Sequence, residues 1–310
     1  MKKICLSLLV AIILITGCGK AEADKGEKTS AGSLVIGTTG VIETTEEIPS
    51  ESETCVPETT EEETTKVVEE TTVAEEETTS PGQIRDEYYS GLVEQAKAEG
   101  RKVVYLTFDD GSSGLTPAVL DTLDEYNVKA TFFVVGAYSG SEENAKTEYN
   151  DIINRGHTLG IHSYTHSRAE MYASLEAFSK ACDDMYDYVV RLTGYTPFLW
   201  RFPGGSATRY ADSRMKTEYV PYIENKGLTY YDWNVSSGDG SGTTTSDAIY
   251  NNVINGVKTK SVSVVLMHDG SGHEKTVAAL PRILDTLINE LNCLIVPITE
   301  STIPVQYNLN

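Results

Sequence analysis

Residues 103–111 read VVYLTFDDG, an apolar and β-branched run that ends on two aspartates and a glycine. Such a run has the length and composition of a buried strand. Similar runs recur along the chain, at 130–135, 157–161, 229–233, 262–267 and 293–298. Helical patterns lie between several of them, at 116–126, 174–192, 245–257 and 275–291. This alternation predicts an α/β fold in which helices cover a parallel sheet, open or closed as a barrel.

Polar side chains follow several of these predicted strands, at the ends where such folds carry their sites. Asp109 and Asp110 close the first run, and His268 ends the run at 262–267. His162 and His166 follow another strand at a spacing that would place both rings on one side of a helical turn. An Asp-Asp-Gly sequence is also a common turn, and a lone histidine at a strand end is often structural. Taken singly, each signal is therefore weak.

One aspartate and two histidines form a three-ligand set with an open position, which is the arrangement of a catalytic metal site. A neighbouring carboxylate can accept a proton from water, and a separate imidazolium can protonate a leaving amine. The other two histidines suggest no such role. His157 precedes a strand and is expected to make structural hydrogen bonds, and His273 lies in a Gly/Ser-rich loop and is expected to be solvated.

The first residues have the features of an export signal, with Lys2 and Lys3 before an apolar run at 4–15. The run ends Ile-Thr-Gly-Cys, which resembles the lipobox of bacterial lipoproteins. This resemblance implies a signal peptide over 1–17 and lipidation of Cys18, which would attach the protein to the membrane by an N-terminal lipid. An ordinary secretory signal with an incidental cysteine is the alternative.

The composition changes twice along the chain. Residues 19–80 hold 17 acidic and 4 basic residues and are rich in Thr and Glu, so we expect a disordered, lipid-anchored tether over 18–82. The catalytic domain is expected over 83–310. The formal net charge of −21 argues against nucleic acid as a partner. The five cysteines show no paired spacing, and Cys182 and Cys293 are expected to be buried apolar residues.

Five motifs between residues 100 and 300 together resemble the polysaccharide deacetylases that share the NodB homology domain, carbohydrate esterase family 4. They are TFDDG at 107–111, HSYTH at 162–166, RFPGG at 201–205, DWN at 232–234 with Asp239, and LMH at 266–268. The resemblance implies a distorted (β/α) barrel with about seven parallel strands. It also implies a divalent metal, with Zn²⁺ favoured over Co²⁺ or Mn²⁺.

The resemblance implies a role for each matching residue. Asp109 would be the general base and His268 the general acid, while Asp110, His162 and His166 would hold the metal. Arg201 would orient the base, and Asp239 would be the charge partner of His268. The N–H of Gly204, directly after Pro203, would donate to the oxyanion. The residues implied to bind substrate are Pro203, Gly204, Trp233 and Leu266. Many members have an aromatic residue where Gly204 stands, so a wall of the substrate groove would be missing here.

The expected substrate is N-acetylglucosamine in peptidoglycan, because a lipid anchor with a long tether would hold a monomeric enzyme at the outer membrane face near the wall. The alternatives are a chitooligosaccharide or acetylxylan deacetylase, and a non-catalytic glycan-binding lipoprotein. A two-carboxylate glycosidase would have no need of the histidine pair.

Overall fold

The structure is a computed structural model that describes residues 81–241 and 244–309. The predicted signal peptide, Cys18 and nearly all of the predicted tether lie outside the described residues. Within the described ranges, no helix combines the length and apolar character needed to cross a bilayer.

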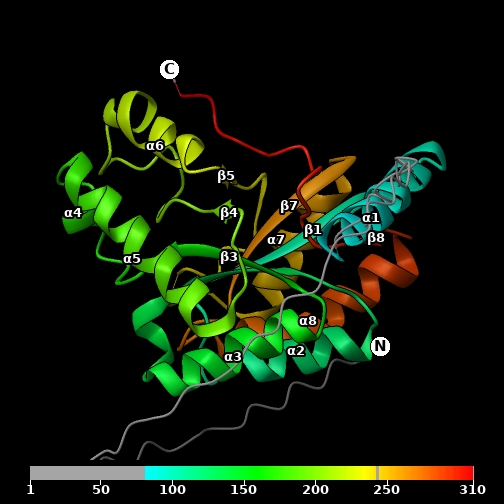
Figure 1. The fold of residues 1–310 in the computed structure, drawn as a ribbon. Helices are drawn as coiled ribbons and strands as arrows, with labels where there is room; N and C mark the ends of the chain where they lie inside the picture. Colours follow the sequence, from blue (N-terminus) through cyan, green and yellow to red (C-terminus); the bar gives the residue numbers. More distant parts are fainter. Residues whose placement is uncertain (1–80, 242–243, 310) are drawn as a thin grey trace, which may run out of the picture. The chain divides into compact units, whose positions relative to one another are not determined.

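The chain alternates strands and helices, as the sequence predicts (Figure 1). The strands are β1 (Val103–Asp109), β2 (Thr131–Val135), β3 (Thr158–Ser163), β4 (Leu199–Trp200), β5 (Thr229–Tyr230), β6 (Val235–Ser236), β7 (Val262–His268) and β8 (Leu294–Ile295). The α-helices are α1 (Pro81–Ala98), α2 (Thr116–Glu125), α3 (Glu142–Asn154), α4 (Arg168–Met171), α5 (Leu175–Thr193), α6 (Val220–Asn225), α7 (Ser246–Lys258) and α8 (Glu274–Asp285). Shorter turns of 3₁₀ or π helix cover Gly136–Ser139, Met215–Tyr219 and Thr286–Glu290.

All strand pairs are parallel, and seven strands follow the order β5-β4-β3-β2-β1-β7-β6. The seven strands form a curled half-barrel, which confirms the predicted distorted barrel. β7 pairs with β1 along its whole length, so β2 and β8 share the other edge of β1. The central strand β1 is buried throughout, which explains why its sequence is a continuous apolar run.

Alternate residues of β1 face two different cores, because successive side chains of a strand point to opposite sides. Val104, Leu106 and Phe108 belong to the larger core, to which α2, α3, α5, α7 and α8 contribute. Val103 and Tyr105 belong to a smaller core on the other face of the sheet. The same alternation places Thr107 and Asp109 on that second face, at the carboxyl end of the strand.

The helix ends follow local signals in the sequence. Ser141, Ser174 and Thr245 each accept a hydrogen bond from a backbone N–H in the first turn of the helix that they precede, α3, α5 and α7 respectively. Gly194 ends α5 with φ +70°, a backbone conformation that favours glycine. These caps fix where each helix leaves the sheet.

The C-terminal segment returns to the strands of the second face. The backbone N–H of Asp232, just after β5, donates to the carbonyl of Val305 at 2.8 Å, and the N–H of Tyr307 donates to the Asp232 carboxylate at 2.8 Å. The side-chain amide of Gln306 donates to the carbonyl of Tyr230. The segment 305–307 is thereby hydrogen-bonded to the chain that leaves β5.

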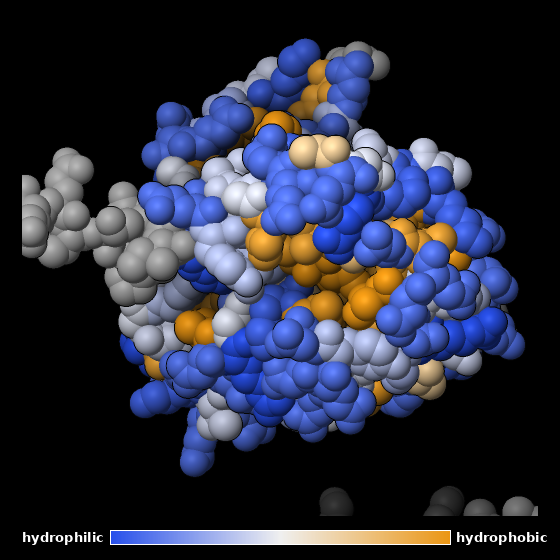
Figure 2. Space-filling view, turned by 90° about the vertical axis from the view of Figure 1, so that its right-hand side faces the viewer, coloured by the Kyte–Doolittle hydropathy of each residue, from blue (hydrophilic) through white to orange (hydrophobic). Residues whose placement is uncertain are grey.

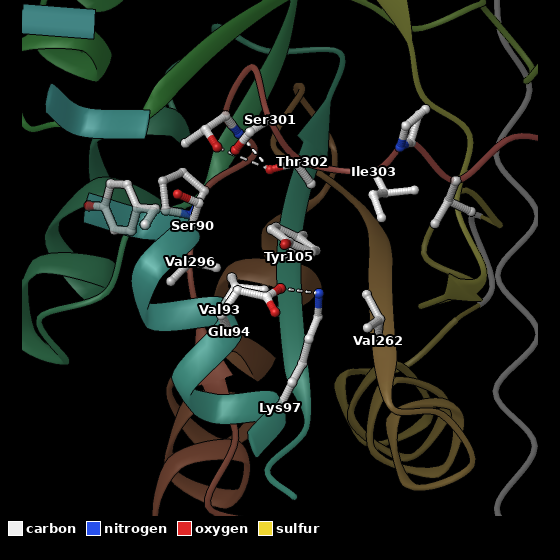
Figure 3. Close-up of a pocket in the computed structure, with 15 residues that line it drawn as sticks. Ser90, Val93, Glu94, Lys97, Tyr105, Val262, Val296, Ser301, Thr302 and Ile303 are labelled. Atoms are coloured by element: carbon white, nitrogen blue, oxygen red, sulfur yellow. Dashed lines mark hydrogen bonds and ion pairs between the residues drawn. The ribbon is translucent and has the colours of Figure 1, made fainter. Parts of the chain in front are cut away.

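A pocket of about 300 Å³ lies between α1, β1 and residues 296–305. Figure 3 shows Tyr105 at its base and the Glu94–Lys97 ion pair at its edge. Figure 2 looks onto the side of the molecule where α1 lies and shows apolar residues gathered in a hollow among hydrophilic ones. None of the predicted site residues lines this pocket, so the candidate chemistry lies elsewhere.

Candidate active site

The carboxyl ends of β1 and β3 bring three predicted ligands together. The Asp110 carboxylate oxygen Oδ1 lies 3.3 Å from Nε2 of His166 and 3.7 Å from Nε2 of His162. Tetrahedral coordination with bonds near 2.05 Å separates ligand atoms by roughly 3.3 Å. These three residues therefore have the spacing of ligands to a single ion.

The two histidines do not meet through a helical turn, so this part of the prediction is wrong. His162 is still in β3, and His166 follows in a bend with φ +58°. The hydroxyl of Ser163 accepts a hydrogen bond from the His166 N–H at 2.9 Å, which closes the bend and brings the two ring centroids to 5.1 Å. Asp110 also has a left-handed backbone, with φ +66°. Backbone strain of this kind is concentrated at functional sites.

The donor chemistry of these three residues fits a divalent metal. His162 Nδ1–H donates to the carbonyl of Arg201 at 2.6 Å, which leaves the lone pair of Nε2 directed to Asp110. Burial lowers the pKa of His162 well below its usual value, so the ring is neutral. Asp110 Oδ1 is buried and has no hydrogen-bond partner among the described residues. A buried oxygen with no hydrogen-bond partner, close to two imidazole nitrogens, is suited to bind a cation.

Asp109 lies beside this cluster and is held by a buried arginine. Its Oδ2 is 3.9 Å from His162 Nε2, and its Oδ1 accepts a 2.8 Å hydrogen bond from Arg201. Burial raises the pKa of Asp109 to about 6, although Arg201 and His268 oppose the shift. Arg201 has no solvent exposure and also donates to Thr107 at 2.6 Å and to two backbone carbonyls, those of Tyr231 and Asp232. The guanidinium is thus fixed in place, and it fixes the Asp109 carboxylate.

His268 ends β7 directly beside the end of β1, because it pairs in register with Asp109. Its Nδ1 lies 2.8 Å from Asp239 Oδ1, and its backbone N–H donates to Asp239 Oδ2. Burial lowers the pKa of His268, but the hydrogen bond and charge of Asp239 outweigh burial and raise it to about 9. Thr276 also donates to Asp239. His268 is therefore a cation held by a fixed carboxylate.

The residues predicted to contact substrate lie on two neighbouring segments and one strand. Pro203 is buried, and Gly204 and Gly205 both have positive φ, at +85° and +78°. A Cβ on Gly205 would lie 3.0 Å from the Trp233 ring, so this glycine permits the close approach of the indole. Leu266 is nearly buried in β7, two residues before His268. The N–H of Gly204 has no protein acceptor in the described part of the chain.

Sequence reasoning missed two residues near this centre. His273 is not solvated as predicted: its ring stacks on His268 with centroids 4.9 Å apart, and only 19% of its side chain is exposed. Asp269 is fully buried behind the Asp109–Asp110 turn, where Thr116 donates to it at 2.6 Å and burial raises its pKa to about 7. The only sequence signal for Asp269 was its place directly after His268. His157 behaves as predicted, since its Nδ1 accepts from the N–H of Ala130.

The fold and site define a class of protein: a hydrolase built on a curled parallel half-barrel, with a buried carboxylate and a cationic imidazole on neighbouring strand ends. The family model for polysaccharide deacetylases matches residues 96–222. A putative polysaccharide deacetylase of Bacillus subtilis, YheN, is 31% identical over 233 residues, which cover 69% of this chain and 76% of that protein. The chain therefore belongs to the polysaccharide deacetylase family.

Further relatives carry more specific names. A peptidoglycan-N-acetylglucosamine deacetylase of Bacillus cereus is 35% identical over 196 residues, covering 60% of this chain and 66% of that protein. The crystal structure of the catalytic domain of peptidoglycan N-acetylglucosamine deacetylase from Eubacterium rectale is 36% identical with a TM-score of 0.63, covering 68% of this chain and 94% of that one. The chain thus spans slightly less than two thirds of the Bacillus cereus relative.

Proposed function

We propose that this protein uses a divalent metal, Zn²⁺ in the first place, to remove acetyl groups from N-acetylglucosamine in peptidoglycan. The observation that carries the proposal is the convergence of Asp110, His162 and His166 around one unpartnered carboxylate oxygen. Asp109 and His268 lie beside this cluster. Burial raises the pKa of Asp109 to about 6, and Asp239 raises that of His268 to about 9. Between these two pKa values Asp109 is ionised and His268 is protonated, so the pair is suited to act as base and acid in one reaction.

Each residue has a task in the proposed reaction. When bound, the ion would polarise the acetamide carbonyl and a water molecule. Asp109 accepts the proton of the attacking water, and Arg201 holds the carboxylate in position to do so. The N–H of Gly204 donates to the oxygen that becomes negative at the carbonyl. His268 gives its proton to the leaving amine, so acetate and a free amino sugar are released.

The name of the Bacillus cereus relative and the predicted N-terminal lipid support peptidoglycan as the substrate. A monomer attached through Cys18 to the outer face of the membrane, with a long acidic segment before the catalytic domain, would reach the nearby wall. Labelled palmitate provides a direct assay of this attachment: the wild-type protein should incorporate it, and a Cys18→Ala variant should not.

The activity itself can be assayed with the full chain. The protein, loaded with Zn²⁺ or Co²⁺, is incubated separately with peptidoglycan glycan strands, a chitin oligomer and acetylated xylan, and acetate is measured. We expect the highest kcat/KM on the peptidoglycan strands. Acetate from xylan alone would replace the proposed substrate, and no acetate from any of the three with metal bound would reject the proposed function.

The metal can be assayed independently of activity. Elemental analysis of the purified protein should give one divalent ion per chain, and Asp110→Asn should lose it. Thr116→Val is a suitable control, because Thr116 contacts Asp269 rather than the three ligands. Retention of the ion by Asp110→Asn would contradict the ligand assignment.

A further inference from the structure

Two arginines near the site have no hydrogen bond or ion pair within residues 81–241 and 244–309. Seven of the nine arginines of the chain make side-chain hydrogen bonds or ion pairs: Arg85, Arg101, Arg155, Arg191, Arg201, Arg214 and Arg282. Arg168 and Arg209 make neither with any described residue. This is unexpected in a chain with 46 acidic and 25 basic residues, where carboxylates are abundant.

Both unpaired guanidinium groups lie against the same aromatic ring. The guanidinium carbon of Arg168 is 5.2 Å from the centroid of Tyr210, and that of Arg209 is 5.6 Å from it. All three side chains are exposed. The ring supports each guanidinium by a cation–π contact and leaves its N–H groups free for a ligand.

This cluster adjoins the proposed oxyanion donor. Arg168 comes two residues after His166, and a Cβ on Gly204 would lie 3.3 Å from Arg168 Nη1 and 3.5 Å from its Cδ. The space beside Gly204 is therefore bordered by the Arg168 side chain and by the Thr208 hydroxyl, whose oxygen would lie 3.1 Å from the same Cβ. A positively charged side chain thus lies directly beside Gly204.

We propose that Arg168, Arg209 and Tyr210 form a subsite that binds a carboxylate on the glycan, next to the sugar that is deacetylated. Guanidinium groups recognise carboxylates through paired, charge-assisted hydrogen bonds, and a tyrosine ring is a surface on which a sugar can stack. This inference rests on the proposed function and narrows it, because peptidoglycan strands carry lactyl or peptide carboxylates on every second sugar. Chitin is neutral, whereas some xylans carry uronic acids.

The subsite can be tested with substrates that differ only in charge. Acetate release is measured on a peptidoglycan disaccharide oligomer with free lactyl carboxylates, on the same oligomer with these carboxylates amidated, on a chitin oligomer, and on a uronate-bearing acetylxylan. For Arg168→Gln we expect the ratio of kcat/KM on the free-carboxylate oligomer to that on the amidated one to fall about tenfold or more, through KM. The double variant with Arg209→Gln should lose more.

Arg282→Gln is the matched control, because Arg282 also lies over a tyrosine, Tyr250, but far along the chain on α8. It should leave the ratio unchanged. An equal loss on charged and neutral substrates in Arg168→Gln would mean that the arginine only supports Gly204, and would overturn the proposal. If kcat/KM of Arg168→Gln fell only on the uronate-bearing xylan, the carboxylate would belong to a uronic acid, and the wall glycan would be rejected as its source.

Binding gives a readout that does not depend on turnover. Calorimetric titration of the metal-free protein should show tighter binding of the free-carboxylate oligomer than of the amidated one, and this difference should shrink with added salt. Arg168→Gln should reduce both the affinity difference and its salt dependence. If no substrate yields acetate but this binding is seen, the proposed function fails and the subsite stands. If acetate is released without a charge preference in binding, the subsite fails alone.

Discussion

The charge of Asp239 should decide the upper pH limit of activity, and Asp239→Asn tests this. Asp239 accepts from His268 through both oxygens and holds the pKa of this histidine at about 9, against an ordinary value of about 6.5. The difference corresponds to about 3.4 kcal/mol in favour of the protonated ring. Without the carboxylate charge, burial should bring the pKa of His268 back toward 6.5 or below it.

The sign of the effect follows from the role of His268 as the acid. A raised pKa keeps the ring protonated as the pH rises, so its loss costs activity on the alkaline side. At pH 8 the protonated fraction would fall from about nine tenths to about 3%, so the variant should be roughly 30-fold slower than the wild type. At pH 5.5 both proteins would be largely protonated, and protonation alone should cost little.

The assay is acetate release from a chitin oligomer between pH 5 and 10, with a thermal melt to check folding. Thr276→Val is the matched control, since it removes one hydrogen bond to Asp239 and keeps the charge. It should move the alkaline limit by less than about one pH unit. If Asp239→Asn lost the same fraction of activity at pH 5.5 and at pH 8, Asp239 would act through structure and the electrostatic reasoning would be refuted.

Three further outcomes are expected. Asp109→Asn should keep the metal, as measured by elemental analysis, and lose kcat by about 10² to 10⁴, whereas Asp110→Asn should lose both; equal metal loss would contradict the division of roles. Gly205→Ala should lower the melting temperature and alter Trp233 fluorescence, because its φ is positive and its Cβ would lie 3.0 Å from the indole; an unchanged melt would oppose this. His157 is buried with a pKa lowered to about 3, so the unfolded chain binds the extra proton between pH 6.5 and 3. As the pH is lowered through this range, the free energy of unfolding measured in urea should therefore decrease by up to about 1.4 kcal/mol per pH unit. His157→Asn should flatten this slope.

The sequence predicted the alternation of elements and the convergence of the strand-end residues well, because both follow from local pattern. The run at 103–108 has the composition of a buried strand, and parallel strands bring their carboxyl ends to one edge. The Asp109–His268 pairing follows directly from that geometry. The short strands β4 and β6 were not predicted, since a strand of two residues barely differs from an extended loop.

The errors arose where the chain departs from regular structure or where contacts are distant in sequence. His166 was placed on a helical turn because a spacing of four is helical, but the Ser163 hydroxyl closes a bend instead. His273 was assigned to solvent from the composition of its loop, and only the fold reveals that His268 lies beneath it. The pairing state of Arg168 likewise depends on which carboxylates the fold leaves out of reach.

The end of the chain bears on the placement of the base. Asp232 hydrogen-bonds through its N–H and carboxylate to residues 305 and 307, and through its carbonyl to Arg201, which grips Asp109. A deletion of the last eight residues would leave every reacting side chain present and yet release the support behind the guanidinium. Proteolytic removal of residues 303–310 should therefore slow the reaction although no reacting group is lost.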